Sequence, residues 1–121
     1  MENVGKKFVN SRVHTLSMQT VMLDAKLTPS MLLDRINSVA YGQLLASIKE
    51  RNYSVKARKE YIDKHLKQYQ MSRATLYNIL KTKKASRRKA ILIRQTFETI
   101  IKEQKLYEGM IVEIDIQEYE R

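Results

Sequence analysis

The sequence predicts a mainly α-helical protein of four to five helices, with a short β-strand near its C-terminus. Three observations support this fold class. The 121 residues include only three glycines and one proline, so turns are few. Apolar residues make up 43% of the chain and recur at helical spacing over most of it. The segment from Met110 to Ile116 alternates instead and is rich in β-branched residues, which is typical of a strand.

The first two helices are expected after residue 28, where the main domain, residues 28–105, begins. Thr28 suits an N-cap and Pro29 suits the first helical position, where the missing N–H costs nothing. Gly42 lies within this segment, so a kink or a break into two helices is expected near it. Asn52 and Ser54 mark a turn and a new cap. The next helix places four apolar residues on one face, namely Val55, Ile62, Leu66 and Tyr69.

Two more helices are expected between residue 72 and residue 105. Ser72 stands at the N-cap position of a helix whose apolar residues are Leu76, Ile79 and Leu80. Lys81 to Ala85 is predicted to be a basic loop. Ser86 then caps a further helix, and Gly109 ends that helix or the loop after it. The apolar positions of this last helix are Ala90, Ile93, Phe97, Ile100 and Ile101.

The two ends of the chain are expected to lie outside the helical domain. Residues 1–27 form an N-terminal arm, in which Val13 to Leu23 is either a strand or irregular. Residues 106–121 form the C-terminal strand and an acidic tail. Because a lone strand is not stable in water, it must pair either with Val13 to Leu23 or with its own copy across a two-fold axis. The second alternative predicts a homodimer.

Charge is concentrated in one part of the sequence. The net charge is +10, from 23 basic and 13 acidic residues. Between Asp63 and Glu98 the chain has ten basic residues and no acidic one, whereas its last nineteen residues carry six acidic and two basic. This pattern indicates one surface that binds a polyanion and a separate acidic segment. The alternative is a cationic face that is merely solvated.

Several functional classes have little support. The sequence has no cysteine, and neither His14 nor His65 has further ligands at metal spacing, so no metal site is expected. It has no nucleotide-binding loop of the GxxxxGK type, and no cofactor is predicted. No signal peptide and no apolar stretch of the roughly 18 residues that a membrane span requires can be found. We therefore expect a cytoplasmic protein that is not an enzyme and binds no membrane.

The segment from Ile62 to Lys81 resembles the helix-turn-helix of phage repressors and of resolvase-type DNA-binding domains. Two helices that cross steeply need apolar contacts at the crossing, and Leu66 and Tyr69 are expected to meet Leu76 and Ile79 there. Met71 fills the turn, and the string Met71-Ser-Arg-Ala-Thr-Leu-Tyr77 is the most specific part of the match. Two positions depart from the pattern. Leu66 replaces a small residue, and Gln70 replaces a glycine that takes a positive φ.

This resemblance implies a four-helix repressor-like domain whose recognition helix begins at Ser72. Arginine binds guanine through two hydrogen bonds, asparagine pairs with adenine, and small methyl groups contact thymine. The resemblance makes Arg73, Tyr77 and Asn78 the best candidates for base contacts. All the implied groove contacts are Ser72, Arg73, Ala74, Thr75, Tyr77, Asn78 and Lys81. The implied phosphate contacts are Lys67, Lys83, Lys84, Arg87, Arg88 and Lys89.

The function predicted on this basis is sequence-specific binding of double-stranded DNA by a small transcriptional regulator of a phage or plasmid, most simply as a homodimer. A second hypothesis is a DNA-recognition subunit of a larger machine, such as a terminase small subunit or a conjugation, partition or replication factor. A third is a structural or RNA-associated helical protein whose basic block is incidental. The oligomeric state distinguishes the first two hypotheses, because large assemblies favour the machine. The third gains support if Arg73→Ala and Asn78→Ala leave the binding of duplex DNA unchanged.

Overall fold

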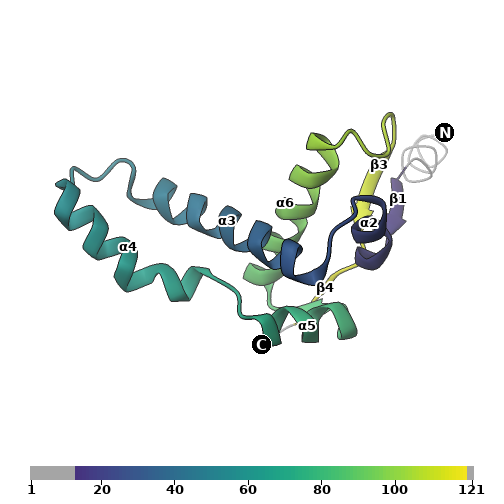
Figure 1. The fold of residues 1–121 in the computed structure, drawn as a ribbon, viewed down its shortest axis with the longest axis horizontal. Helices are drawn as coiled ribbons and strands as arrows, with labels where there is room; N and C mark the ends of the chain where they lie inside the picture. The colour runs from purple at the N-terminus through teal and green to yellow at the C-terminus, as the bar shows by residue number, and fades with distance from the viewer. Residues whose placement is uncertain (1–12, 120–121) are drawn as a thin grey trace, which may run out of the picture.

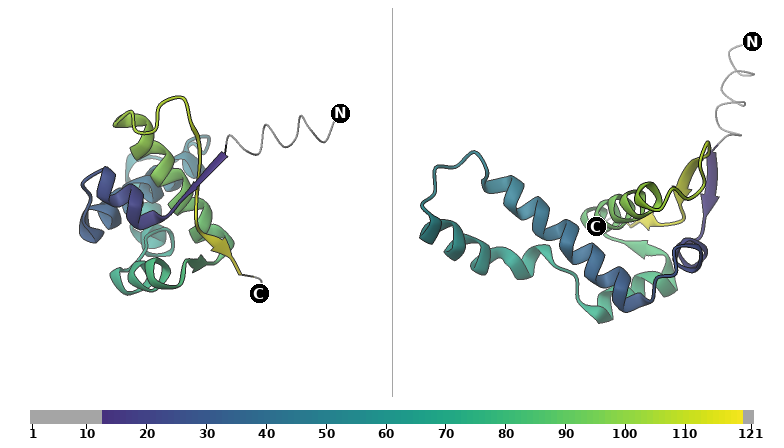
Figure 2. Two further views of the ribbon diagram at one scale, coloured as in Figure 1. Left: turned by 90° about the vertical axis from the view of Figure 1, so that its right-hand side faces the viewer. Right: turned by 45° about the horizontal axis from the view of Figure 1, so that its top comes forward.

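The computed structural model describes residues 13–119, and this part of the chain is mainly helical (Figures 1 and 2). The predictions for residues 1–12 and 120–121, which belong to the N-terminal arm and the acidic tail, lie outside the described residues. The helices are α2 (Met18–Asp24), α3 (Pro29–Ile48), α4 (Val55–Tyr69), α5 (Arg73–Thr82) and α6 (Arg87–Glu103). The strands are β1 (Val13–Leu16), β2 (Lys84–Ala85), β3 (Ile111–Ile114) and β4 (Gln117–Glu118).

Helices α3 and α4 form a long antiparallel hairpin that projects from the rest of the molecule (Figures 1 and 2). Both predicted caps are confirmed, because Thr28 accepts a hydrogen bond from the Met31 N–H at 3.2 Å and Ser54 accepts one from the Ala57 N–H at 3.1 Å. Helix α3 runs unbroken through Gly42, so the predicted break is wrong. A Cβ atom added at Gly42 would meet no neighbouring atom, so this exposed glycine leaves the packing of α3 undisturbed.

The hairpin has an apolar seam of its own. Leu44 and Ile48 of α3 are buried, whereas Ile62 and Leu66 of α4 are half-buried. Val55 is 88% exposed, so its predicted place on the apolar face of α4 is wrong. It is the first residue of α4, and it lies at the tip of the hairpin, where α3 no longer covers it.

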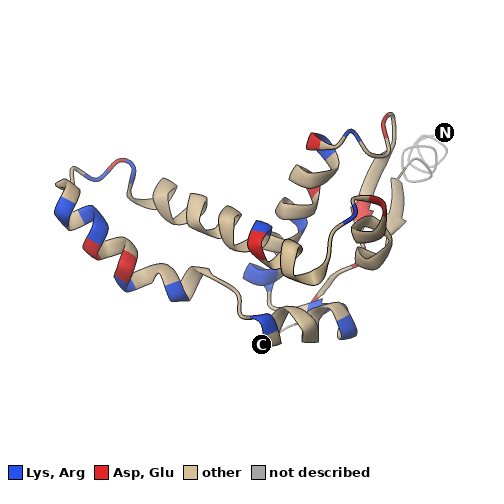
Figure 3. Ribbon diagram, in the orientation of Figure 1, with Lys and Arg blue, Asp and Glu red and all other residues tan. Residues whose placement is uncertain are grey.

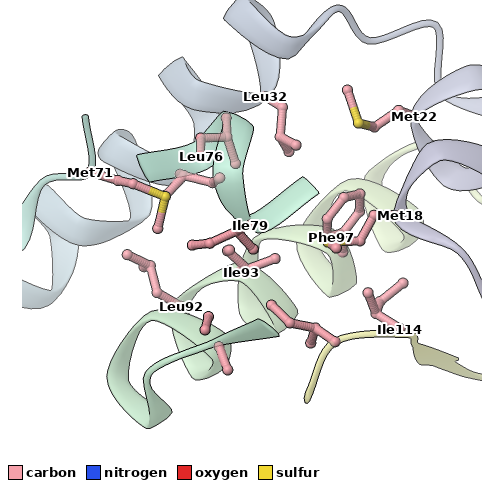
Figure 4. Close-up of a cluster of buried hydrophobic side chains, with 14 of the residues drawn as sticks. Met18, Met22, Leu32, Met71, Leu76, Ile79, Leu92, Ile93, Phe97 and Ile114 are labelled. Atoms are coloured by element: carbon pink, nitrogen blue, oxygen red, sulfur yellow. The ribbon is translucent and has the colours of Figure 1, made fainter. Parts of the chain in front are cut away.

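The main core lies where α3 packs against α6 and α5, and side chains from all three helices belong to one buried cluster (Figure 4). Figure 4 shows Leu76, Ile79 and Ile93 gathered at its centre, with Phe97 beside Met18 of α2. Phe97 is fully buried, as are most of its neighbours. The helical spacing predicted for α6 is confirmed, since Ala90, Ile93, Phe97 and Ile100 all face this core and Ile101 packs at its edge.

The strands form two small parallel pairs. β1 pairs with β3 in a register that aligns Val13 with Ile111 and Leu16 with Ile114. The C-terminal strand therefore pairs with the segment that begins at Val13, which was one of the two predicted alternatives. β2 pairs with β4, and Lys84 aligns with Gln117. The predicted basic loop from Lys81 to Ala85 is wrong in part, because α5 continues to Thr82 and Lys84–Ala85 is a strand.

The prediction for Val13 to Leu23 is half wrong, because only its first four residues form a strand. Ser17 accepts a hydrogen bond from the Thr20 N–H at 3.0 Å and caps α2. Met18, Val21 and Met22 are buried at the i, i+3, i+4 spacing of one helical face. The residues from Met18 onward therefore follow a helical pattern, and the cap at Ser17 is the signal that separates the two elements.

The chain turns back after α6 through residues 104–110. Gly109 has a φ of +77° and ends this loop immediately before β3, which was one of the predicted alternatives. Tyr107 donates a hydrogen bond to Asp24 at the end of α2. Burial is the main cause that raises the pKa of the Tyr107 hydroxyl to about 12, and the contact with Asp24 raises this pKa as well. The contact joins the loop to α2, beside the β1–β3 pair.

Candidate nucleic-acid interface

The start of α5 is set by Ser72, as predicted. Its hydroxyl accepts a hydrogen bond from the Thr75 N–H at 3.2 Å, while its own backbone is extended at φ −82° and ψ 159°. Gln70 is also extended, at φ −80° and ψ 158°. The turn between α4 and α5 therefore needs no glycine. In this respect it differs from a turn with a left-handed residue at that position.

Asn37 of α3 fixes this turn, and the sequence pattern did not predict this contact. Its side-chain amide donates to the Met71 carbonyl at 3.1 Å and accepts from the Met71 N–H at 2.7 Å. One side chain thus satisfies both backbone polar groups of a residue that is only 5% exposed. The clamp attaches the turn to α3 directly before the first residue of α5.

Removing this clamp is expected to destabilise the fold. In Asn37→Ala the N–H and carbonyl of Met71 lose their partner, and each of these two part-buried hydrogen bonds contributes about 0.5–1.5 kcal/mol to stability. We expect the free energy of unfolding, measured by urea denaturation, to fall by about 1–3 kcal/mol. Ser38→Ala, one residue along on the exposed side of α3, is the matched control and should change it by less than about 0.5 kcal/mol. Equal effects of the two variants would contradict a clamping role.

Helix α5 has one buried side and one open side. Leu76 and Ile79 are buried and Met71 fills the turn, as predicted, and Tyr69 packs against the same cluster. Leu66 is half-buried and lies outside that cluster, so the prediction that it meets Leu76 and Ile79 is wrong. The predicted groove residues lie on the open side. Thr75 is half-buried, and the exposed ones are Ser72, Arg73, Ala74, Tyr77, Asn78 and Lys81.

Most of the predicted phosphate contacts are exposed beside α5. Lys67 lies in the last turn of α4, Lys84 lies in β2, and the first turn of α6 carries Arg87, Arg88 and the half-buried Lys89. Figure 3 shows basic residues at both ends of α5 and at the start of α6, whereas most of α3 is uncharged. Lys83 differs from the others, because its ammonium group lies 3.0 Å from the Asp115 carboxylate.

Two adjoining pockets separate α4 and the turn from the start of α6. The first has a volume of about 400 Å³ and includes Tyr69, Met71, Ser86 and Arg88 in its lining. The second has a volume of about 370 Å³ and is lined by residues that include Lys67, Ser72 and Lys89. The guanidinium of Arg88 lies 4.7 Å from the centre of the Tyr69 ring, in a cation–π contact. A concave, cationic surface therefore continues from the start of α5 to α6.

Within residues 13–119, no three His, Asp or Glu side chains lie close enough together to hold a metal ion. Among the helices that the structure describes, none is long and apolar enough to cross a membrane. No protein-family model matches the chain, and no curated protein or solved structure resembles it significantly.

Proposed function

We propose that this protein binds double-stranded DNA sequence-specifically, with α5 inserted in the major groove in the manner of a repressor-like helix-turn-helix domain. The observation that carries the proposal is the orientation of α5. Leu76 and Ile79 anchor it to the core, while Arg73 and Asn78 extend from the open side. Both side chains suit the donor and acceptor pattern of base edges in the major groove.

The cations around α5 supply the second part of the proposal. Lys67, Lys84, Arg87 and Arg88 are exposed close to the same helix in the chain, and the sequence from residue 64 to residue 97 contains no carboxylate that would repel a phosphate. Such a surface gives affinity that does not depend on sequence and holds the protein in register. The proposed role is that of a small transcriptional regulator of a phage or plasmid.

We also propose that the protein binds DNA as a dimer, but for another reason than the unpaired strand considered in the sequence analysis. β3 already pairs with β1, so an unpaired C-terminal strand no longer calls for a second copy. A single recognition helix contacts only a few base pairs, and two copies related by a two-fold axis read a longer palindromic site. Selection of duplexes from a random DNA pool tests both parts of the proposal. A palindromic consensus is expected, and recovery of no consensus would contradict sequence-specific binding.

Arg73 is expected to specify part of the selected site. Arg73→Ala should weaken binding to the consensus by about 1–3 kcal/mol and relax the preference at one base pair, because a bidentate contact is lost. Fluorescence anisotropy with single-base variants of the consensus measures both effects. Arg58→Ala removes an exposed arginine from the hairpin instead and should leave the preference unchanged. An Arg73→Ala variant with wild-type preference would support the structural or RNA-associated hypothesis.

A further inference from the structure

Asp115 holds the C-terminal end of α5 through contacts that are distant in sequence. Its Oδ2 atom lies 3.0 Å from the Lys83 ammonium group, and its Oδ1 atom accepts a hydrogen bond from the Met18 N–H at 2.8 Å. The Asp115 side chain is 19% exposed. One carboxylate thus connects the residue that ends α5 with the first turn of α2, where the free N–H groups of a helix favour a negative charge.

Lys83 is arranged for this contact by its backbone. It is the C-cap of α5, with a left-handed φ of 61°, and its N–H donates to the Ile79 carbonyl at 2.7 Å. Its carbonyl accepts from the Gln117 N–H at 2.8 Å, so the same residue joins β2 to β4. Gln19 of α2 adds a hydrogen bond to the Leu80 carbonyl at 2.9 Å. The last turn of α5 is therefore attached to α2 and to the segment that carries β3 and β4.

We propose that Asp115 is a positioning residue for DNA recognition, which fixes the angle of α5 through Lys83 and keeps Lys83 out of the phosphate contacts. This inference rests on the proposed function. If the last turn of α5 moves while its start stays fixed by Asn37, Asn78 and Lys81 are misplaced on the base edges. Contacts with phosphates along the same surface tolerate such a movement better, because their geometry is less demanding. Asp115 therefore acts on specificity more than on overall affinity.

The first variant is Asp115→Asn, which keeps an oxygen for the Met18 N–H but removes the charge that pairs with Lys83. Binding to the selected consensus should weaken about two- to fivefold, as expected for a partly exposed ion pair. Binding to a random duplex should stay equal or become tighter, because a negative charge near the DNA is lost. The matched control is Glu118→Gln, which breaks the 2.9 Å ion pair of the same C-terminal segment with Arg94 of α6. It should leave the ratio of the two affinities unchanged.

Lys83→Gln separates positioning from phosphate binding. A lysine that contacts a phosphate would weaken binding to both duplexes, and its loss would reduce the slope of log K against log salt by about 1. We expect the slope to stay unchanged and the consensus affinity alone to fall, as in Asp115→Asn. The double variant Asp115→Asn/Lys83→Gln should be no worse than either single variant, because both remove one contact. Additive losses, or a reduced slope, would overturn the proposal.

Amide hydrogen exchange without DNA gives an independent measurement. In Asp115→Asn the amides at the C-terminal end of α5 should exchange about two- to fivefold faster, while those of α3 keep their rates. Wild-type exchange rates in α5 would overturn the positioning role, whatever the protein does with DNA. A wild-type protein without any duplex preference would overturn the proposed function instead. The two failures are thus distinguishable.

Discussion

Raising the salt concentration from 50 to 200 mM is expected to weaken binding to a random duplex by about 500-fold. The cations that we assign to phosphate contact are Lys67, Lys84, Arg87, Arg88 and Lys89, and all but the half-buried Lys89 are exposed. Each neutralised phosphate releases counterions, so these contacts predict a slope of log K against log salt of about −4.5. Anisotropy titrations at four or five salt concentrations measure this slope.

Variants on a single helix provide the control for this prediction. Arg87→Gln lies at the start of α6 and should reduce the steepness of the slope by about 1. Lys102→Gln lies in the last turn of the same helix, far from α5, and should leave it unchanged. If the two variants had equal effects, or if binding hardly depended on salt, the basic surface described here would not be the DNA-binding surface.

The helix starts were predictable because their signals are local. Thr28, Ser54 and Ser72 each accept a hydrogen bond from the N–H three residues ahead, and a short polar side chain before an apolar helical pattern is enough to indicate this. Ser86 also occupies an N-cap position, although its hydroxyl makes no capping bond. The alternation from Met110 to Ile116 likewise predicted β3, because period-two burial is a property of the strand itself.

The elements that were missed depend on distant partners. β4 and β2 have two residues each and exist because they pair with one another, so neither segment shows a pattern of its own. Asn37 clamps Met71 from another helix, and nothing in the α3 pattern distinguishes it from any other polar residue. The pairing of Lys83 with Asp115 was hidden for the same reason. The basic block and the acidic tail were predicted to be separate, yet the tail supplies a partner for the block.

The sequence predicted which side of α5 is exposed, but not the contacts that hold this helix in place. Helical periodicity placed Leu76 and Ile79 inside, the resemblance placed Arg73 and Asn78 outside, and the structure has them so. The contacts that orient this face come from α2, α3 and the C-terminal segment. Asn37 holds the start of α5 and Asp115 holds its end. Both residues lie outside the segment from Ile62 to Lys81 that resembles a helix-turn-helix.

Phe97→Ala is expected to have the largest effect on stability, about 3–5 kcal/mol. The ring is fully buried and lies beside Met18 in the cluster that joins α6 to α2, α3 and α5. Its loss removes apolar contacts and leaves a cavity that these helices can close only in part. A domain of this size has a total stability of roughly 5–15 kcal/mol, so the variant should unfold at a markedly lower urea concentration. Circular dichroism during urea titration measures the shift.

Ile91→Ala is the control for Phe97→Ala, because it distinguishes the loss of core packing from the effect of any truncation on α6. Ile91 is 39% exposed on the same helix, so its truncation removes less buried area and should cost under about 1 kcal/mol. A small effect at Phe97 would contradict the packing of the buried cluster that α5 and α6 share. In that case α5 would lack the rigid base that directs Arg73 and Asn78 outward, and the assignment of α5 as a recognition helix would fail with it.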